Sequence, residues 1–152
     1  MVFMRWSVMA GGWHKPGANA SLRALVMHQC DPMSLRLYEY KGCDTCRRAR
    51  KFLEARGVAF DAIPIREQPP TQGELKRMLA IYGGDLRRLF NTSGGDYKAM
   101  KLADRLPELT VDEALALLAA NGNLVKRPFV LTDKGGVVGF KEPEWEKLLA
   151  GG

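Results

Sequence analysis

Two cysteines, Cys43 and Cys46, are separated by two residues and stand at the start of a predicted helix. A thiol reacts as its thiolate, and the unpaired N–H groups and partial positive charge of a helix N-terminus stabilise that anion. Arg47 and Arg48 add positive charge nearby, so we predict that the pKa of Cys43 lies below the free value of about 8.5. The expected roles are Cys43 as the exposed attacking thiol and Cys46 as the partly buried resolving thiol.

Two other interpretations of the cysteine pair stay open at this point. A zinc site needs about four ligands, and the chain has no second Cys-x-x-Cys and no histidine after Met33, so we expect no metal. His14 and His28 both precede Met33, which excludes general-base catalysis by histidine from the main domain. The two cysteines could also be inert and buried, although their position on a turn into a helix favours reactivity.

A second segment with potential chemistry is Lys126-Arg127-Pro128, directly before an apolar stretch at 129–131. A proline before a strand is a candidate for a cis peptide bond, which in a fold of this order would bring the backbone alongside the cysteine loop. Arg127 would then face the thiolate or an anionic substrate. Taken alone, an arginine before a proline is more often a solvated surface residue.

Hydrophobic periodicity predicts the elements that position these residues. Apolar alternation predicts strands at 35–40 and 58–65, the second at a sheet edge because Pro64 cannot donate to a ladder. Between them, 44–56 has one apolar helical face and ends before Gly57. That face consists of Cys46, Ala49, Phe52 and Leu53. The last predicted elements are a strand at 129–131, a hairpin turn at 133–136, a strand at 137–140 and a helix carrying Trp145, Leu148 and Leu149.

The middle of the chain is predicted to be helical. Thr71 with Glu74, and Thr110 with Glu113, have the spacing of capping boxes. Each box is followed by apolar residues at helical spacing. The expected inward faces are Leu75, Met78, Leu79 and Tyr82 in the first helix, and Val111, Ala114, Leu115, Leu118 and Ala119 in the second, which stops near Gly122. We expect a short helix at 85–90 and a polar turn at 91–96 between them.

The element order β-α-β, helical block, β-β-α predicts an α/β fold. It would be a small mixed sheet flanked by helices, with a helical insertion at about 68–122 between the second and third strands. A right-handed crossover places the Cys43 loop at the C-terminal end of the first strand. Residues 1–32 differ in composition and are expected to be a disordered or non-native leader, or alternatively a regulatory or targeting extension, before a domain at 33–152.

Length, charge and cysteine content exclude several classes. The 152 residues suit one domain, and no apolar run approaches the roughly 18 residues that cross a membrane, so no membrane partner is expected. The net charge of +6 is spread along the chain without a basic stripe, so direct nucleic-acid binding is not expected. With Cys30 incidental in the leader, a single Cys-x-x-Cys is typical of a reducing compartment, and we predict a cytoplasmic protein.

Four separated motifs in the chain carry a resemblance to a known family. They are Gly42-Cys43-Asp44-Thr45-Cys46-Arg47-Arg48-Ala49-Arg50, then Pro69-Pro70-Thr71 before Glu74-Leu75, then Leu89-Phe90-Asn91-Thr92, then Lys126-Arg127-Pro128. In this order they resemble the ArsC family of arsenate-reductase-related proteins, including its YffB-like and Spx-like branches. The resemblance runs from Leu35 to the C-terminus. It implies a thioredoxin- or glutaredoxin-like fold and a nucleophilic cysteine at Cys43.

Arsenate reductases of this family hold the oxyanion with one cysteine and three arginines. By resemblance, Cys43 is that cysteine and Arg127 the last arginine, whereas Gln72 and Asn91 stand at the other two positions. Each charge-assisted hydrogen bond to an oxyanion contributes roughly 1.5 to 3 kcal/mol. The loss of two arginines should therefore weaken arsenate binding by more than about tenfold. The expected catalytic residues are Cys43, Cys46 and Arg127. The expected substrate-binding residues are Arg47, Gln72, Asn91 and Pro128.

Three functions follow from the resemblance. The first is a thiol-disulfide oxidoreductase in which Cys43 attacks the substrate and Cys46 or an external thiol resolves the intermediate. Its partners would be glutathione, glutaredoxin or thioredoxin, with no bound cofactor and glutathione as co-substrate. The alternative is an Spx-like redox-sensing transcriptional regulator that binds RNA polymerase. The third, a true arsenate reductase, is disfavoured by Gln72 and Asn91.

Overall fold

A computed structural model describes residues 35–151, and the predicted leader with Cys30 lies outside them. Its four strands are β1 (Leu35–Glu39), β2 (Phe60–Pro64), β3 (Phe129–Leu131) and β4 (Gly136–Val138). They form one sheet in the order β2-β1-β3-β4, with β1 parallel to β2 and antiparallel to β3, and β3 antiparallel to β4. This confirms the predicted mixed sheet and places Pro64 on an edge strand.

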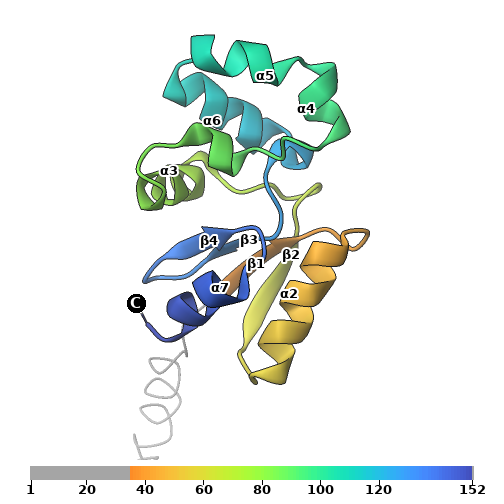
Figure 1. Ribbon diagram of the computed structural model, residues 1–152, viewed down its shortest axis with the longest axis vertical. Helices are drawn as coiled ribbons and strands as arrows, with labels where there is room; N and C mark the ends of the chain where they lie inside the picture. Colours follow the sequence, from red (N-terminus) through yellow and green to blue (C-terminus); the bar gives the residue numbers. More distant parts are fainter. Residues whose placement is uncertain (1–34, 152) are drawn as a thin grey trace, which may run out of the picture. The chain divides into compact units, whose positions relative to one another are not determined.

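The helices divide into two groups around this sheet. The α-helices are α2 (Asp44–Ala55), α3 (Gln72–Ile81), α4 (Gly95–Ala99), α5 (Leu102–Arg105), α6 (Val111–Ala120) and α7 (Glu142–Leu149). The 3₁₀ helices are η1 (Leu86–Leu89), η2 (Leu106–Glu108) and η3 (Gly122–Leu124). All elements from α3 to η3 lie between β2 and β3, which is the predicted helical insertion (Figure 1). Within residues 35–151, no helix has the length and apolar character to cross a membrane.

Alternation along β1 sends side chains to two separate cores. Leu35 and Leu37 lie in a cluster with residues of α2, α7 and the β-hairpin, which are Ala49, Phe52, Leu53, Val130, Val137 and Trp145. Tyr38 lies in the opposite cluster, which also holds Phe129 and residues of the insertion. The sheet is therefore covered by α2 and α7 on one face and by the insertion on the other (Figure 1).

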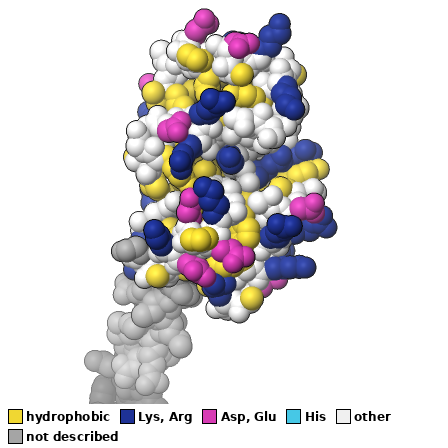
Figure 2. Space-filling model, in the orientation of Figure 1, with side chains coloured by type: hydrophobic (Ala, Val, Ile, Leu, Met, Phe, Trp, Pro, Cys, Tyr) yellow, Lys and Arg dark blue, Asp and Glu magenta, His cyan; other side chains and the backbone are white. Residues whose placement is uncertain are grey.

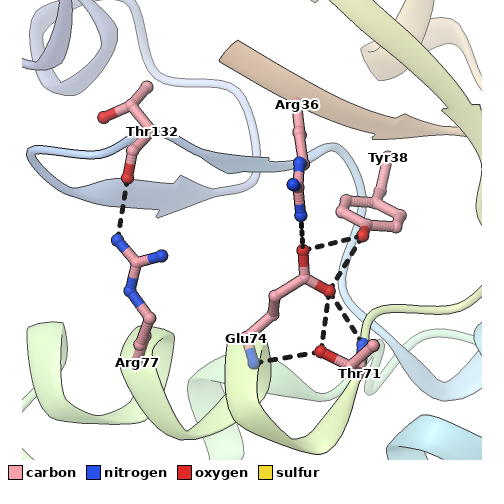
Figure 3. Close-up of polar contacts among 6 residues, drawn as sticks. All are labelled: Arg36, Tyr38, Thr71, Glu74, Arg77 and Thr132. Carbon is pink, nitrogen blue, oxygen red and sulfur yellow. Dashed lines mark hydrogen bonds and ion pairs between the residues drawn. The ribbon is translucent and has the colours of Figure 1, made fainter. Parts of the chain in front are cut away.

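Both predicted capping boxes are present, and one of them attaches the insertion to the sheet. The buried Glu74 carboxylate accepts hydrogen bonds from Thr71 N–H (2.9 Å), from Arg36 Nη1 (2.7 Å) and from the Tyr38 hydroxyl (2.9 Å to the nearer oxygen). Figure 3 shows these groups converging on Glu74 from β1 and α3. Thr110 and Glu113 form the second box on the surface, at the start of α6.

The predicted apolar face of α2 is confirmed, because its buried residues are Cys46, Ala49, Phe52 and Leu53. The helix ends at Ala55, and Gly57 follows with a left-handed φ of 64°, as a C-terminal stop requires. Other boundaries differ from prediction. β4 ends at Val138 because Gly139 takes a φ of 75°, which no extended strand accommodates. Ile65 lies beyond β2, although its N–H still donates to Glu39 O at 3.0 Å.

Two predictions for the insertion are wrong. Val111 is 47% exposed, because it is the first residue of α6 and the buried stripe begins one turn later at Ala114. The polar turn expected at 91–96 is shorter, since Gly95 already starts α4. The short helix expected at 85–90 is confirmed, and it is the 3₁₀ helix η1.

Candidate active site

The cysteine loop connects β1 directly to α2. Cys43 N–H donates to Tyr40 O at 3.0 Å, and Cys43 O accepts from Arg47 N–H at 3.1 Å, so Cys43 is the N-cap residue of α2. Gly42 is required by a close approach, because a Cβ there would lie 2.7 Å from Tyr40 Cε1. The Tyr40 ring therefore packs against the backbone immediately before Cys43.

The two thiols have opposite environments. Burial raises the pKa of Cys43, but hydrogen bonding from the backbone and side chains of Cys46 and Thr45 outweighs it, and the resulting pKa lies below the ordinary value of 9.0. Burial is also the main cause that raises the pKa of Cys46 to about 12, and the neighbouring Cys43 raises it further. Near neutral pH, Cys43 is therefore the thiol with the larger thiolate fraction.

The direction predicted for Cys43 and one predicted cause, the backbone N–H groups at the start of α2, are confirmed, whereas Arg47 and Arg48 are not among the causes and Cys43 is less exposed than predicted. Cys43 is half-buried and Cys46 is buried, because the Cys43 sulfur turns back onto the first turn of α2. The groups that lower the Cys43 pKa belong to Thr45 and Cys46. Arg47 instead pairs with Asp44 on the exposed face of the helix, with its side chain 64% exposed.

Arg127 lies beside this loop, as the sequence predicted, because its guanidinium lies over the ring of Tyr40. The Arg127-Pro128 bond is cis, and Pro128 O accepts from Gly139 N–H at 2.8 Å. The charge of Arg127 acts on Cys46 and opposes the rise of its pKa. Its guanidinium carbon lies 5.1 Å from the centre of the Tyr40 ring, and its buried Nη1 has no acceptor among the described residues. The guanidinium is thus held by a ring rather than by a carboxylate.

A groove of about 330 Å³ adjoins Arg127 and the start of α2. It is lined by Thr45, Tyr82, Arg88, Lys126, Arg127, Val138, Gly139, Phe140, Lys141 and Glu144. Glu144, its one acidic residue, pairs with Lys141 at 3.2 Å. Thr45, which lines the groove, also hydrogen-bonds Cys43, so one lining residue is in direct contact with the candidate nucleophile. Its volume and excess of positive charge suit a small substrate that carries negative charge.

The remaining predicted binding residues have other contacts. Gln72 is exposed at the first position of α3. Asn91 Nδ2 donates to Asn123 O at 3.4 Å, and Asn91 N–H donates to Leu124 O at 2.7 Å, so Asn91 connects the end of η1 to η3. The structure therefore brings Cys43, Cys46 and Arg127 together, and Pro128 follows Arg127 through the cis bond. The roles of Arg47, Gln72 and Asn91 in binding stay predictions.

Sequence reasoning missed two basic groups of the groove, Arg88 and Lys141. They come from η1 and from the residue before α7, more than fifty positions apart, and nothing local in the sequence links them. Tyr40 was also missed, although its position directly before the cysteine loop was a usable signal.

With this geometry, the comparison with known proteins is decisive for the family. The model of the ArsC family matches residues 38–148. The chain belongs to the ArsC family. Bacillus subtilis (strain 168) YusI is 44% identical over 118 residues, covering 78% of this chain and 100% of YusI. The global transcriptional regulator Spx 1 of Lactococcus lactis subsp. lactis (strain IL1403) is 32% identical over 113 residues, covering 74% of this chain and 87% of the regulator.

A solved structure supports the same assignment. The crystal structure of an ArsC-family-related protein from Bacteroides fragilis is 43% identical and aligns with a TM-score of 0.72. The alignment covers 76% of this chain and 98% of that protein. The family resemblance and the thioredoxin-like fold expected for an ArsC member are thereby confirmed.

Proposed function

We propose that this ArsC-family protein is a thiol-disulfide oxidoreductase with Cys43 as its nucleophile. The observation that carries the proposal is the placement of half-buried Cys43 at the N-cap of α2 and of buried Cys46 in its first turn, which lowers the pKa of Cys43 and raises that of Cys46 to about 12. A low-pKa thiol attacks, and a buried neighbour that stays protonated waits to resolve the intermediate.

The reaction proceeds in two exchanges that conserve electrons. The Cys43 thiolate attacks one sulfur of a disulfide, forming a mixed disulfide and releasing the other half as a thiolate. Cys46 then loses its proton to solvent and attacks the Cys43 sulfur, which releases the second thiolate and leaves a Cys43–Cys46 disulfide. Two glutathione thiols, or one dithiol of the glutaredoxin or thioredoxin type, supply the two electrons that restore both thiols. An external glutathione could also resolve the mixed disulfide directly.

Formation of the mixed disulfide itself activates Cys46. In the reduced protein, the hydrogen bond and the charge of Cys43 both raise the pKa of Cys46, whereas the charge of Arg127 lowers it. Once the Cys43 sulfur is bonded to substrate, it no longer carries negative charge, so the contributions from Cys43 disappear while that of Arg127 persists. The pKa of Cys46 therefore falls when its nucleophilicity is needed.

The surroundings of Cys43 favour a substrate that carries carboxylates, such as glutathione disulfide or a glutathionylated protein. Arg127 and Lys126 line the groove beside the nucleophile, and neither forms an ion pair within the described part of the chain. Glutathione, the proposed reducing donor, is available in the cytoplasm, which is the location we propose. Gln72 and Asn91 bring no charge, so arsenate reduction is the less favoured activity.

A second candidate is a redox-sensing transcriptional regulator that binds RNA polymerase. It is favoured by the 32% identity to the Lactococcus lactis regulator Spx 1. Figure 2 shows basic side chains spread over the visible face with acidic ones among them, a surface better suited to a protein partner than to direct nucleic-acid binding.

The test is turnover of hydroxyethyl disulfide with glutathione as the donor, and of glutathione disulfide with a thioredoxin-type dithiol as the donor. The intact protein should turn over, Cys43→Ser should be inactive, and Cys46→Ser should keep activity only with glutathione as the resolving thiol. An inactive intact protein that co-purifies with RNA polymerase only when oxidised would replace this proposal with the regulator.

A further inference from the structure

The Tyr40 ring contacts two arginines that come from opposite parts of the sequence. The guanidinium carbon of Arg66, in the segment after β2, lies 3.8 Å from the ring centre, and that of Arg127 lies 5.1 Å from it. Both distances fall within the range of cation–π attraction. The same ring packs on Gly42, so both guanidinium groups lie against a side chain that contacts the cysteine loop.

The charges of these arginines are left largely uncompensated. Neither Arg66 nor Arg127 forms an ion pair with an acidic residue in 35–151. Hydrogen bonds from Asn121 and Asn123 hold the Asp96 carboxylate and lower its pKa, and the charge of Arg66 adds only a smaller effect. A ring contact fixes a guanidinium without cancelling its charge, whereas a carboxylate would neutralise it. The two arginines therefore remain available to an anion.

The backbone that carries Arg66 is held in place by the insertion. A Cβ on Gly122 would lie 1.8 Å from Ile65 O and 3.1 Å from Arg66 Cα, so η3 packs directly against this segment. Such packing leaves little freedom to the Arg66 main chain, which reduces the ordering cost of binding.

We propose that Tyr40, Arg66 and Arg127 form an anion-recognition platform beside Cys43, in which Arg66 binds a carboxylate of the disulfide that Cys43 attacks. The inference rests on the proposed function for the identity of the reacting compound. Arg66 would add a second positive charge to that of Arg127, from outside the predicted site. The uncharged Gln72 and Asn91 cannot supply such a charge. The substrate class is a disulfide of glutathione type, with free carboxylates.

Binding without redox chemistry tests the platform directly. S-methylglutathione, which cannot exchange, is titrated into the Cys43→Ser protein, and binding is followed by calorimetry or by NMR shifts. Adding Arg66→Gln should weaken binding about five- to tenfold, since one partly exposed charge-assisted contact is lost. Tyr40→Leu should weaken binding at least as much. Arg105→Gln removes an exposed arginine of α5 and is the matched control, which should bind as its parent does.

Kinetics of the intact protein separate this inference from the proposed function. Arg66→Gln should raise KM for glutathione disulfide more than KM for the uncharged hydroxyethyl disulfide. Unchanged S-methylglutathione affinity in Arg66→Gln, or an equal loss in Arg105→Gln, would overturn the platform. Because Arg66 is exposed, this variant remains informative if Tyr40→Leu fails to fold. If the intact protein shows no turnover but S-methylglutathione still binds and its binding depends on Arg66, the result would count against the oxidoreductase and would support the platform.

Discussion

Glu74→Ala should be among the most destabilising single substitutions on the sheet-facing side of the insertion. The Glu74 carboxylate is buried and accepts hydrogen bonds from Arg36 Nη1, the Tyr38 hydroxyl and the Thr71 N–H, at 2.7, 2.9 and 2.9 Å (Figure 3). Loss of the capping interaction costs about 1 kcal/mol. The buried Tyr38 hydroxyl left without a partner costs about 1 to 3 kcal/mol more. Arg36 is 52% exposed, so its ion pair adds little.

The expected loss in the free energy of unfolding is therefore about 2 to 4 kcal/mol, measured by urea denaturation. Glu113→Ala is the matched control, because Glu113 has the same capping geometry at the start of α6 but lies on the surface. It should lose less than about half as much, since only a cap is removed. In a Tyr38→Phe background, the cost of Glu74→Ala should shrink. Equal losses for Glu74→Ala and Glu113→Ala would refute the argument.

The same residue gives a pH dependence with a defined sign. Burial opposes ionisation of Glu74, but hydrogen bonds from Thr71, Arg36 and Tyr38 outweigh it and lower its pKa below the ordinary 4.5. Its contribution to stability is thus fully present above about pH 4.5 and is lost as the pH falls through the lower folded pKa. The stability difference between the parent and Glu74→Gln should narrow on acidification below pH 4.5, and a constant difference would contradict the assignment.

Competitive alkylation should label Cys43 before Cys46 at every pH below about 10, because the Cys46 pKa is raised to about 12; equal rates would remove their separate roles. Gly122→Ala should destabilise the protein by at least about 2 kcal/mol, because the new Cβ meets Ile65 O at 1.8 Å and only backbone movement relieves that contact. Gly95→Ala, where a Cβ meets nothing within 4 Å, should have little effect in the same unfolding assay.

Local signals predicted much of this fold. The capping boxes at Thr71 and Thr110 fixed two helix starts, because a hydroxyl and a carboxylate three residues apart satisfy the free N–H groups of a first turn. The buried face of α2 followed from helical periodicity, and Gly57 marked its end. The position of Cys43 on a turn into α2 was enough to predict the direction of its pKa shift.

Features that depend on tertiary contacts could not be predicted in this way. Helices α4 and α5 contain only five and four residues, too short for a periodic stripe, and Lys101 interrupts them with a left-handed φ of 50°. Arg66 and Tyr40 are far apart in sequence, so their stacking is visible only once β1 and β2 are paired. The Arg47 prediction used proximity along the chain, whereas helical geometry turned this side chain toward Asp44.

The most direct test of the central claim is peptide mapping by mass spectrometry after exposure to glutathione disulfide. The Cys46→Ser protein should accumulate one glutathione adduct on Cys43, because the resolving thiol is absent. The protein without substitutions should instead yield a Cys43–Cys46 disulfide, with no stable glutathione adduct at either residue. An adduct that forms equally fast on Cys46 in a Cys43→Ser protein, or an unmodified chain in which both thiols stay reduced, would contradict the account.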